Sequence, residues 1–393
     1  MDLSSLSKKF SDIFVISHTR YFFAPGRINL IGEHTDYNGG NVFPCAITFG
    51  TYGLARKRED RLIRLYSMNF PESGIIEFSL QDLNYNKEHN WANYPKGIIK
   101  FLLEDNSEIN SGVDILFYGN IPSGAGLSSS ASIELVTGVI IDSLFELNMN
   151  RLDLVKLGKK VENEFIGVNS GIMDQFAIGM GSKGCGILLD CQTLKYEYAP
   201  VLLENHHLII MNSNKRRELV SSKYNERREE CQQALSDIQK HIKVESLGQL
   251  SEQEFELVKD TIKNETVRKR AKHAVYENHR TLKALKELKN NNLKVFGELM
   301  NQSHISLRDD YEVTGIELDT LVEAAWQQPG VIGARMTGAG FGGCAIAIVE
   351  KEYTEAFLKK VGMAYTEKIG YEACFYIAGI GDGAKEITME VLQ

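Results

Sequence analysis

Three segments of the sequence combine residue types whose spacing could do chemistry, and the first of them is residues 25–37. Within it, Glu33, His34 and Asp36 lie in a span of four residues. A sugar hydroxyl both donates and accepts hydrogen bonds, so a sugar site needs carboxylates and imidazole aimed at neighbouring hydroxyls. The segment therefore fits a sugar site or, equally well on composition alone, a polar surface turn. A metal site at His34 and Asp36 is a weaker interpretation, because the other ligands have no obvious source.

The second segment, residues 119–132, is rich in glycine and serine. It follows a strand-like run, Val113–Tyr118, and leads into a predicted helix, Ser129–Leu147. Glycines let the backbone approach a ligand closely, and the first turn of a helix offers unpaired N–H groups and the positive end of its dipole. The segment thus fits a phosphate cradle, in which Ser130 could offer its hydroxyl to Mg²⁺. A glycine-rich turn with a serine N-cap is the alternative, but three consecutive serines after two glycines favour phosphate.

Other nucleotide-binding motifs fit this sequence poorly. A Walker A loop needs GxxxxGK followed by serine or threonine, and no such string occurs. A dinucleotide fingerprint needs a third glycine where this chain has Ser129, and no acidic residue is evident at the end of a following strand. The HRD and DFG strings of protein kinases are absent as well. A dehydrogenase is therefore disfavoured.

The third segment, residues 335–343, is glycine-rich and runs into a strand-like stretch, Cys344–Val349. Because a strand follows rather than a helix, this segment is not a second dinucleotide loop. A flexible loop that closes over a phosphate or a sugar is one interpretation. A tight structural turn is nearly as good an interpretation of this segment by itself.

Taken together, the three segments resemble, in order and spacing, the three sequence motifs of the GHMP small-molecule kinases. The first, from Gly26 to Tyr37, looks like the galactokinase signature. Further matches to the galactokinases lie at residues 91–97, 171–176 and 221–228, so the resemblance spans nearly the whole chain. It implies two α+β domains, residues 1–200 and 201–393, with the active site in the cleft between them.

The resemblance also implies roles for particular residues. The family's sugar-binding positions fall on Arg27, Glu33, His34, Asp36, Gly171, Asp174 and Tyr224. Asp174 also falls on the catalytic aspartate and Arg27 on its partner. The ATP phosphate loop aligns with Pro122, Ser123, Gly124, Ala125, Gly126, Leu127, Ser128, Ser129 and Ser130. Ser130 and Glu162 align with the Mg²⁺ positions, and Ser67 and Trp91 lie near the adenine pocket.

The activity implied is ATP-dependent phosphorylation of the anomeric hydroxyl of D-galactose, which gives galactose 1-phosphate and ADP in the first step of galactose catabolism. The signature does not separate galactose from N-acetylgalactosamine or L-arabinose. Some galactokinase-like proteins are sensors that bind galactose and ATP without turnover, but they tend to lose a Ser-Ala pair that stands intact here in residues 128–132. Whether Asp174 acts as a general base or only electrostatically stays open.

Composition limits the other classes of function. The 393 residues are 43% hydrophobic and 24% charged, which is typical of a globular protein with a substantial core. A net charge of −8 argues against a broad nucleic-acid surface, although Mg²⁺ and backbone donors still allow ATP to bind. The sequence shows no signal peptide and no apolar run of membrane-spanning length, so we expect a cytoplasmic protein that does not bind membranes. The sequence leaves the oligomeric state open, and a monomer is compatible with it.

Hydrophobic periodicity predicts several further elements. Strands are expected at 62–66, 184–190, 208–211, 344–349 and 375–380, and helices at 152–165, 217–243 and onward to about 301. The alternating charges between Lys215 and Glu230 indicate a solvated helix face. The domain boundary is placed near Pro200.

Overall fold

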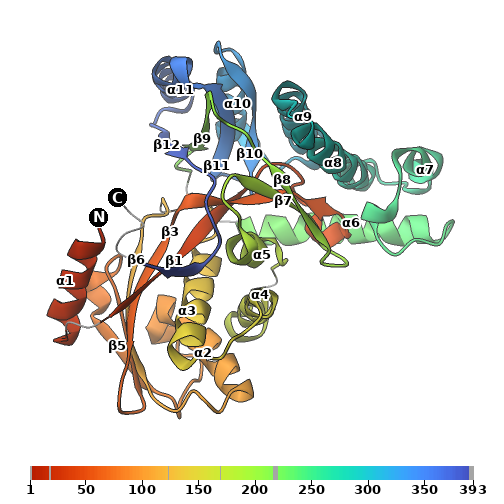
Figure 1. Ribbon diagram of the computed structural model, residues 1–393. Helices are drawn as coiled ribbons and strands as arrows, with labels where there is room; N and C mark the ends of the chain where they lie inside the picture. The colour runs from red at the N-terminus through yellow and green to blue at the C-terminus, as the bar shows by residue number, and fades with distance from the viewer. Residues whose placement is uncertain (1, 17–18, 123, 169, 216–219, 389–393) are drawn as a thin grey trace.

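The computed structural model describes residues 2–16, 19–122, 124–168, 170–215 and 220–388, apart from the side chains of 220 and 221. Helices and sheets are mixed in both halves of the chain, which confirms the predicted α+β fold (Figure 1). The first half, together with β13 from the second, builds a six-stranded sheet in the order β13-β1-β3-β6-β4-β5. Among its paired strands, only β4 and β6 run parallel. Its strands are β1 (Arg20–Asn29), β3 (Pro44–Lys57), β4 (Leu62–Ser67), β5 (Ile75–Ser79), β6 (Val113–Gly119) and β13 (Lys385–Ile387).

Helices cover both faces of this sheet. One face carries α1 (Leu3–Phe14), and the other carries α2 (Asn93–Asp105), α3 (Ser129–Phe145), α4 (Arg151–Lys160) and α5 (Met173–Met180) (Figure 1). Successive residues of a strand point to opposite faces. Leu116 of β6 accordingly packs with the apolar side of α1, whereas its neighbours Ile115 and Phe117 pack with α3.

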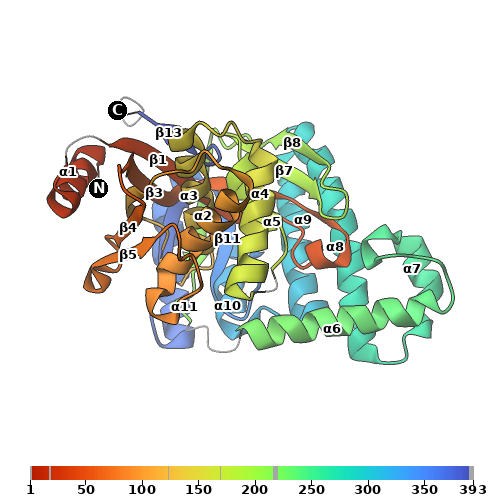
Figure 2. The same ribbon diagram turned by 90° about the horizontal axis from the view of Figure 1, so that it is seen from below.

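The second half builds a four-stranded antiparallel sheet in the order β10-β11-β9-β12. Its strands are β9 (His206–Asn212), β10 (Val331–Thr337), β11 (Cys344–Glu350) and β12 (Cys374–Ala378). The helices of this half are α6 (Val220–Gln239), α7 (Glu252–Val258), α8 (Glu265–Lys289), α9 (Leu293–Ser306), α10 (Gly315–Trp326) and α11 (Thr354–Ile369). Figure 2 shows α6 and α7 projecting to one side of the molecule. A small third sheet consists of β2 (Asn41–Val42), β7 (Cys185–Asp190) and β8 (Tyr196–Pro200).

Most predicted elements are confirmed, and the differences have physical causes. The predicted helix 152–165 is α4 followed by a π-helical turn, Val161–Ile166. The long charged helix is α6, and residues 217–219 of that prediction lie outside the described residues. The prediction of a solvated face is wrong for Arg227, which is buried and donates to Glu230 and to the Tyr311 carbonyl oxygen. Alternating signs on a helix can therefore include a buried, fully paired arginine.

Buried side chains form separate cores in the two halves and a third cluster shared between them. The shared cluster joins Ile28 and Leu30 of the first half to Ile210 and Ile346 of the second. Strand β13, which follows the second sheet in the chain, pairs with β1 of the first half. The two halves are therefore joined both by the chain connection near residue 200 and by this strand pairing. A domain boundary near residue 200 stays a proposal. It would assign β13 to the C-terminal domain, although β13 pairs with the sheet of the N-terminal domain.

A buried carboxylate lies in the six-stranded sheet, outside the three segments. Asp114 of β6 is fully buried and forms ion pairs with Arg56, Arg58 and Arg64 at 2.5, 2.8 and 2.7 Å. The three guanidinium groups are only partly exposed and repel one another. Asp114 is therefore the negative charge that allows Arg56 of β3, Arg58 just after β3 and Arg64 of β4 to lie close together.

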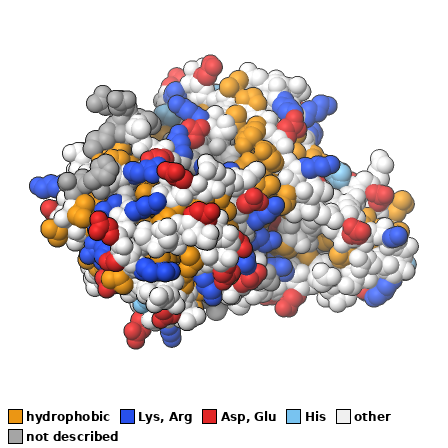
Figure 3. All heavy atoms as spheres, turned by 60° about the horizontal axis from the view of Figure 1, so that its bottom comes forward, with side chains coloured by type: hydrophobic (Ala, Val, Ile, Leu, Met, Phe, Trp, Pro, Cys, Tyr) orange, Lys and Arg blue, Asp and Glu red, His pale blue; other side chains and the backbone are white. Residues whose placement is uncertain are grey.

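The described surface has no dominant charge on the face shown in Figure 3, where basic and acidic side chains are interspersed. Within the described ranges, every helix is too short or too polar to span a lipid bilayer.

Candidate active site

The candidate site centres on the carboxylate of Asp174 in the first turn of α5. Arg27 of β1 donates to both of its oxygens, from Nε to Oδ1 at 2.9 Å and from Nη2 to Oδ2 at 3.0 Å. The Ser128 hydroxyl also donates to Oδ2. A carboxylate in the first turn of a helix is favoured by the helix dipole. The two predicted catalytic residues thus lie in direct contact, in a bidentate geometry that fixes the orientation of the carboxylate.

The phosphate-loop segment adjoins this pair. Arg27 donates from Nη1 to the Gly126 carbonyl oxygen at 2.9 Å, and its backbone N–H donates to the Leu127 carbonyl oxygen at 3.1 Å. Ser128 has φ of 63°, and α3 begins directly after it. The segment therefore places the unpaired N–H groups at the start of α3 beside Asp174.

Individual residues of the loop differ in their surroundings. Ala125 and Leu127 are buried in the shared cluster, so their side chains anchor the loop. Ser123 lies outside the described residues. Pro122, Gly124, Ser129 and Ser130 line a cavity of about 390 Å³. The predicted phosphate loop therefore presents only part of its side chains to a ligand.

Ser67 and Trp91, the two residues predicted near adenine, line the same cavity. The Trp91 ring stacks on Phe70 with centroids 6.5 Å apart and the planes inclined by 14°. Its indole N–H is buried, and no acceptor in the described part of the chain reaches it. The cavity thus offers aromatic surface beside the start of α3.

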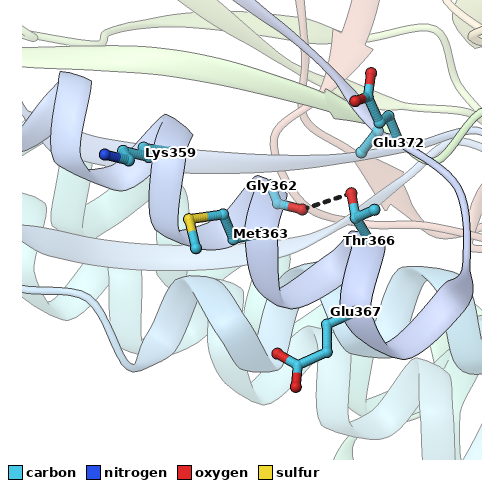
Figure 4. A pocket seen from close by; sticks show the side chains of 7 residues that line it. Lys359, Gly362, Met363, Thr366, Glu367 and Glu372 are labelled. Carbon is cyan, nitrogen blue, oxygen red and sulfur yellow. Dashed lines mark hydrogen bonds between the residues drawn. The ribbon is translucent and has the colours of Figure 1, made fainter.

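A larger cavity, of about 540 Å³, lies elsewhere and contains none of the motif residues. It is lined by one side of α11, including Lys359 and Met363, and by the segment at Glu372 (Figure 4). The one hydrogen bond drawn there runs within the helix, from the Thr366 hydroxyl to the Gly362 carbonyl oxygen at 2.9 Å. Size alone therefore does not locate the site.

The two predicted magnesium residues are in contact. The Ser130 hydroxyl donates to Oε1 of Glu162 at 2.9 Å, across from α3 to the π-helical turn. Burial raises the pKa of the Glu162 carboxyl, and Asp174 nearby adds to the increase. Among the described residues, no three histidine, cysteine or acidic side chains cluster as a metal site would require. One carboxylate and one hydroxyl nevertheless fit Mg²⁺, which is held by few protein oxygens together with substrate phosphates and water.

The sugar signature surrounds Asp36. A Cβ atom at Gly171 would lie 2.2 Å from Oδ2 of Asp36, so only glycine fits at that position with Asp36 where it is. Burial raises the pKa of the Asp36 carboxyl, and the charge of Asp174 adds to the effect. Tyr224 of α6 is close to both carboxylates, which raise the pKa of its buried hydroxyl further. Residues from both halves of the chain therefore meet at Asp36.

Glu33 ties the first segment to the third. Its carboxylate is buried, and it accepts from the backbone N–H of Gly338 at 2.6 Å and from Nδ2 of Asn29. Nη1 of Arg335 lies 3.5 Å from Oε1. Because a carboxylate has about four acceptor positions, Glu33 keeps capacity for a further donor.

His34 adopts a left-handed backbone, with φ of 61°. Its ring lies in tilted contact with two aromatic rings, at centroid distances of 5.7 Å from Tyr224 and 4.8 Å from Tyr311. Both ring nitrogens contact protein atoms, Nδ1 with the Tyr37 hydroxyl at 2.8 Å and Nε2 with the Ala339 carbonyl oxygen at 3.2 Å. The ring is therefore held by protein on both sides.

Sequence reasoning did not find the buried groups that support the signature from α8 and β10. Glu277 accepts from the Gly32 backbone N–H at 3.0 Å and from the Ser303 hydroxyl at 2.5 Å. Burial acts to raise its pKa, but Arg280, His273 and Arg335 outweigh that effect and hold it at about 2. Glu277 is one glutamate in a highly charged helix, and nothing in the local pattern marks it as buried.

The comparisons with known proteins agree with this arrangement. The chain matches three family models, namely the galactokinase galactose-binding signature at residues 8–57, the GHMP kinases N terminal domain at 93–182 and the GHMP kinases C terminal model at 284–364. It is 58% identical to a galactokinase of Clostridium beijerinckii, with 98% of this chain and 99% of the relative covered. It is 61% identical to a galactokinase of Exiguobacterium sibiricum, with 99% of each covered. The chain belongs to the galactokinase family.

Solved structures of galactokinase and related kinases have the same fold as this chain. A Lactococcus lactis galactokinase complexed with galactose matches with a TM-score of 0.94 and 56% identity, over 98% of this chain and all of the other. A mevalonate kinase matches with a TM-score of 0.67 at 23% identity, and this likeness concerns the fold alone. The predicted family, fold class and kinase activity are thereby confirmed for this galactokinase family member. The roles of its individual site residues stay predictions.

Proposed function

We propose that this galactokinase family member transfers the γ-phosphoryl group of ATP to the anomeric hydroxyl of D-galactose, giving galactose 1-phosphate and ADP. The reaction is the first step of galactose catabolism. One observation carries the proposal, namely the Asp174 carboxylate held by Arg27 and Ser128 between the sugar signature and the start of α3. Only at that point do an acidic acceptor, the sugar segment and a phosphate cradle come together in the described chain.

In the proposed step, the anomeric oxygen attacks the γ-phosphorus and the bond to the ADP oxygen breaks. The proton of the sugar hydroxyl passes to the Asp174 carboxylate, and ADP leaves with the bonding electrons. Because phosphoryl transfer has a loose transition state, positioning and charge neutralisation do most of the work. Arg27 orients Asp174 and adds positive charge next to the transferred group.

We place the sugar against the side chains that surround Asp36 and Asp174. Glu33 and Asp36 supply carboxylate acceptors, and the small size of Gly171 leaves room for the Asp36 carboxylate. Tyr224 closes the site from α6. The predicted sugar-binding set is Arg27, Glu33, His34, Asp36, Gly171, Asp174 and Tyr224. Within it, both ring nitrogens of His34 already contact protein atoms, so its imidazole borders the sugar without hydrogen-bonding it.

We place ATP with its phosphates at the start of α3 and its base in the cavity of about 390 Å³. The unpaired N–H groups of the first helical turn suit phosphate. The stacked Phe70 and Trp91 rings that line this cavity suit an aromatic base. The proposed ATP-binding set is Ser67, Trp91, Pro122, Ser123, Gly124, Ala125, Gly126, Leu127, Ser128, Ser129 and Ser130.

Ser130 and Glu162 would hold Mg²⁺ in this proposal. The ion supplies positive charge that neutralises the phosphate oxygens. The chain's own contribution is to keep a hydroxyl and a buried carboxylate together beside the start of α3.

Replacing Glu162 with glutamine is expected to raise the Mg²⁺ concentration needed for half-maximal velocity about tenfold, since one charge-assisted contact is lost. The measurement is ADP release at saturating ATP and galactose over a magnesium titration. Glu164→Gln is the matched control, because Glu164 is exposed two residues away and should leave the titration unchanged. Equal titrations for both variants and the parent would remove Glu162 from the metal site.

The function itself is tested by ADP release from MgATP with D-galactose, N-acetylgalactosamine, L-arabinose and D-glucose, each against a control without sugar. We expect rapid turnover with galactose and little with the others. A preference for another sugar of the panel would keep the kinase and change its substrate. Tight galactose binding without turnover on any sugar would instead support a sensor.

A further inference from the structure

A continuous chain of hydrogen bonds leads away from His34 into the second half of the protein. The Tyr37 hydroxyl lies 2.8 Å from Nδ1 of His34 and 2.8 Å from the Tyr311 hydroxyl. The Tyr311 hydroxyl in turn lies 3.1 Å from Sγ of Cys231. On the other side of the imidazole, Nε2 faces the Ala339 carbonyl oxygen at 3.2 Å. Four segments distant in the sequence therefore meet through one imidazole ring.

The direction of every bond in this chain follows from counting hydrogens. A carbonyl oxygen can only accept, so Nε2 of His34 must carry its proton toward Ala339. A neutral imidazole carries one proton, so Nδ1 is an acceptor and the Tyr37 hydroxyl must donate to it. Each hydroxyl has a single hydrogen, so Tyr311 must donate to Tyr37.

The same counting fixes the end of the chain. Once the Tyr311 hydrogen points to Tyr37, the contact with Cys231 requires the thiol to donate to the Tyr311 oxygen. Cys231 and Tyr311 are both buried. The thiol of α6 thus ends the sequence of donors that begins at His34.

The neutral state of His34 is supported by its surroundings. Burial lowers the pKa of His34 to about 3, and the neighbouring His273, Arg227 and Arg335 act in the same direction. Two tyrosine rings also contact the imidazole, Tyr311 at 4.8 Å and Tyr224 at 5.7 Å between centroids. The protein therefore leaves neither ring nitrogen with a vacant hydrogen-bonding position.

We propose that Tyr37, Tyr311 and Cys231 hold His34 as its Nε2–H tautomer, so that the ring positions the third glycine-rich segment at Ala339 instead of hydrogen-bonding the sugar. His34 is then a positioning residue. This inference rests on the proposed function for its consequence in catalysis, but the tautomer itself does not depend on turnover.

The consequence follows from what lies next to Ala339. The preceding Gly338 donates its N–H to Glu33, and a Cβ atom on Gly338 would lie 3.7 Å from the Gly126 carbonyl oxygen of the phosphate loop. The third segment therefore lies between the sugar signature and the phosphate loop. A loose Ala339 would disturb the alignment of the two substrates more than the binding of either.

The decisive measurement is the tautomer of His34, read from long-range ¹H–¹⁵N correlation spectra of the full chain labelled with ¹⁵N-histidine. His34→Gln identifies the resonance by its loss. We expect the Nε2–H form, unchanged when galactose is added. The Nδ1–H form, or a galactose-induced change of tautomer, would overturn the proposal.

Tyr37→Phe tests the chain, because it removes one hydroxyl and keeps the ring. We expect the Nδ1 resonance of His34 to move toward that of a nitrogen without a donor. Tyr365→Phe is the matched control, since its buried hydroxyl donates instead to the Ser213 carbonyl oxygen and does not join this chain. An unmoved Nδ1 resonance in Tyr37→Phe would overturn the proposal.

Kinetics of the same variants test the consequence. Tyr37→Phe and Tyr311→Phe are expected to lower kcat about fivefold, as for the loss of one hydrogen bond, with little change in galactose affinity. A loss confined to galactose affinity would instead assign the ring to sugar binding. A parent protein that turns over no sugar would reject the proposed function and leave the spectroscopic result standing.

Discussion

Replacing Asp174 with asparagine is expected to lower galactose turnover about 1000-fold, within the range typical of a lost general acid or base. The amide cannot take the proton of the sugar hydroxyl, and its NH₂ group would face the donors of Arg27 and Ser128. Galactose and ATP should still bind, because Asp36, Glu33 and the start of α3 are unchanged. Single-turnover ADP release and equilibrium binding of each substrate measure the two effects separately.

Asp153→Asn is the matched control for this variant. This substitution makes the same chemical change, and it is also in the first turn of a helix. Asp153, however, is exposed on α4. Its turnover should equal that of the parent. Turnover of Asp174→Asn close to that of the parent would remove Asp174 from the mechanism, and a loss of galactose binding alone would make it a sugar ligand only.

Replacing Asp114 with asparagine is expected to lower the free energy of unfolding by about 3 kcal/mol, the typical effect of removing one partner of a buried ion pair. The reason is that Arg56, Arg58 and Arg64 would then face one another without the central carboxylate. Catalysis per folded molecule should not change, since Asp114 lies away from the proposed site.

Urea unfolding followed by tryptophan fluorescence measures this effect. With Trp326→Phe introduced into the parent and into each variant, the fluorescence reports Trp91 alone, which packs on Phe117 of the same strand as Asp114. Asp60→Asn is the control, because Asp60 pairs with Arg58 at an exposed position and its loss should leave the midpoint nearly unchanged. Equal midpoints for the two variants would show that the arginines need no central carboxylate.

The sequence predicted those parts of the fold and site that depend on local pattern. Alternation and apolar runs located β4, β6, β9 and β11. The glycine and serine segment before α3 predicted a loop whose backbone meets a helix start, and the structure places Arg27 and Asp174 there. Those two residues were assigned through family resemblance, since an isolated aspartate beside a glycine has many structural uses.

Long-range burial was not predictable in the same way. Glu277 and Arg335 lie far apart in the sequence. Only the packing of α8 and β10 on α9, and on the signature, brings them together around Gly32 and Glu33. In the sequence, Arg227 does not differ from its exposed charged neighbours. Its burial becomes evident only in the structure, where it donates to the Tyr311 carbonyl oxygen. Periodicity indicates which face of an element is apolar. It does not indicate which buried polar group of another element will contact that face.

The return of β13 to β1 sets an order of events during protein synthesis. The ribosome makes residues 385–387 after all four strands of the second sheet, so the outer edge of β1 lacks its β13 partner until then. An unpaired strand edge in a nascent chain is a template for association with other chains. A nascent chain whose synthesis stops before β13 would therefore expose this edge of β1, which is then open to association with other chains.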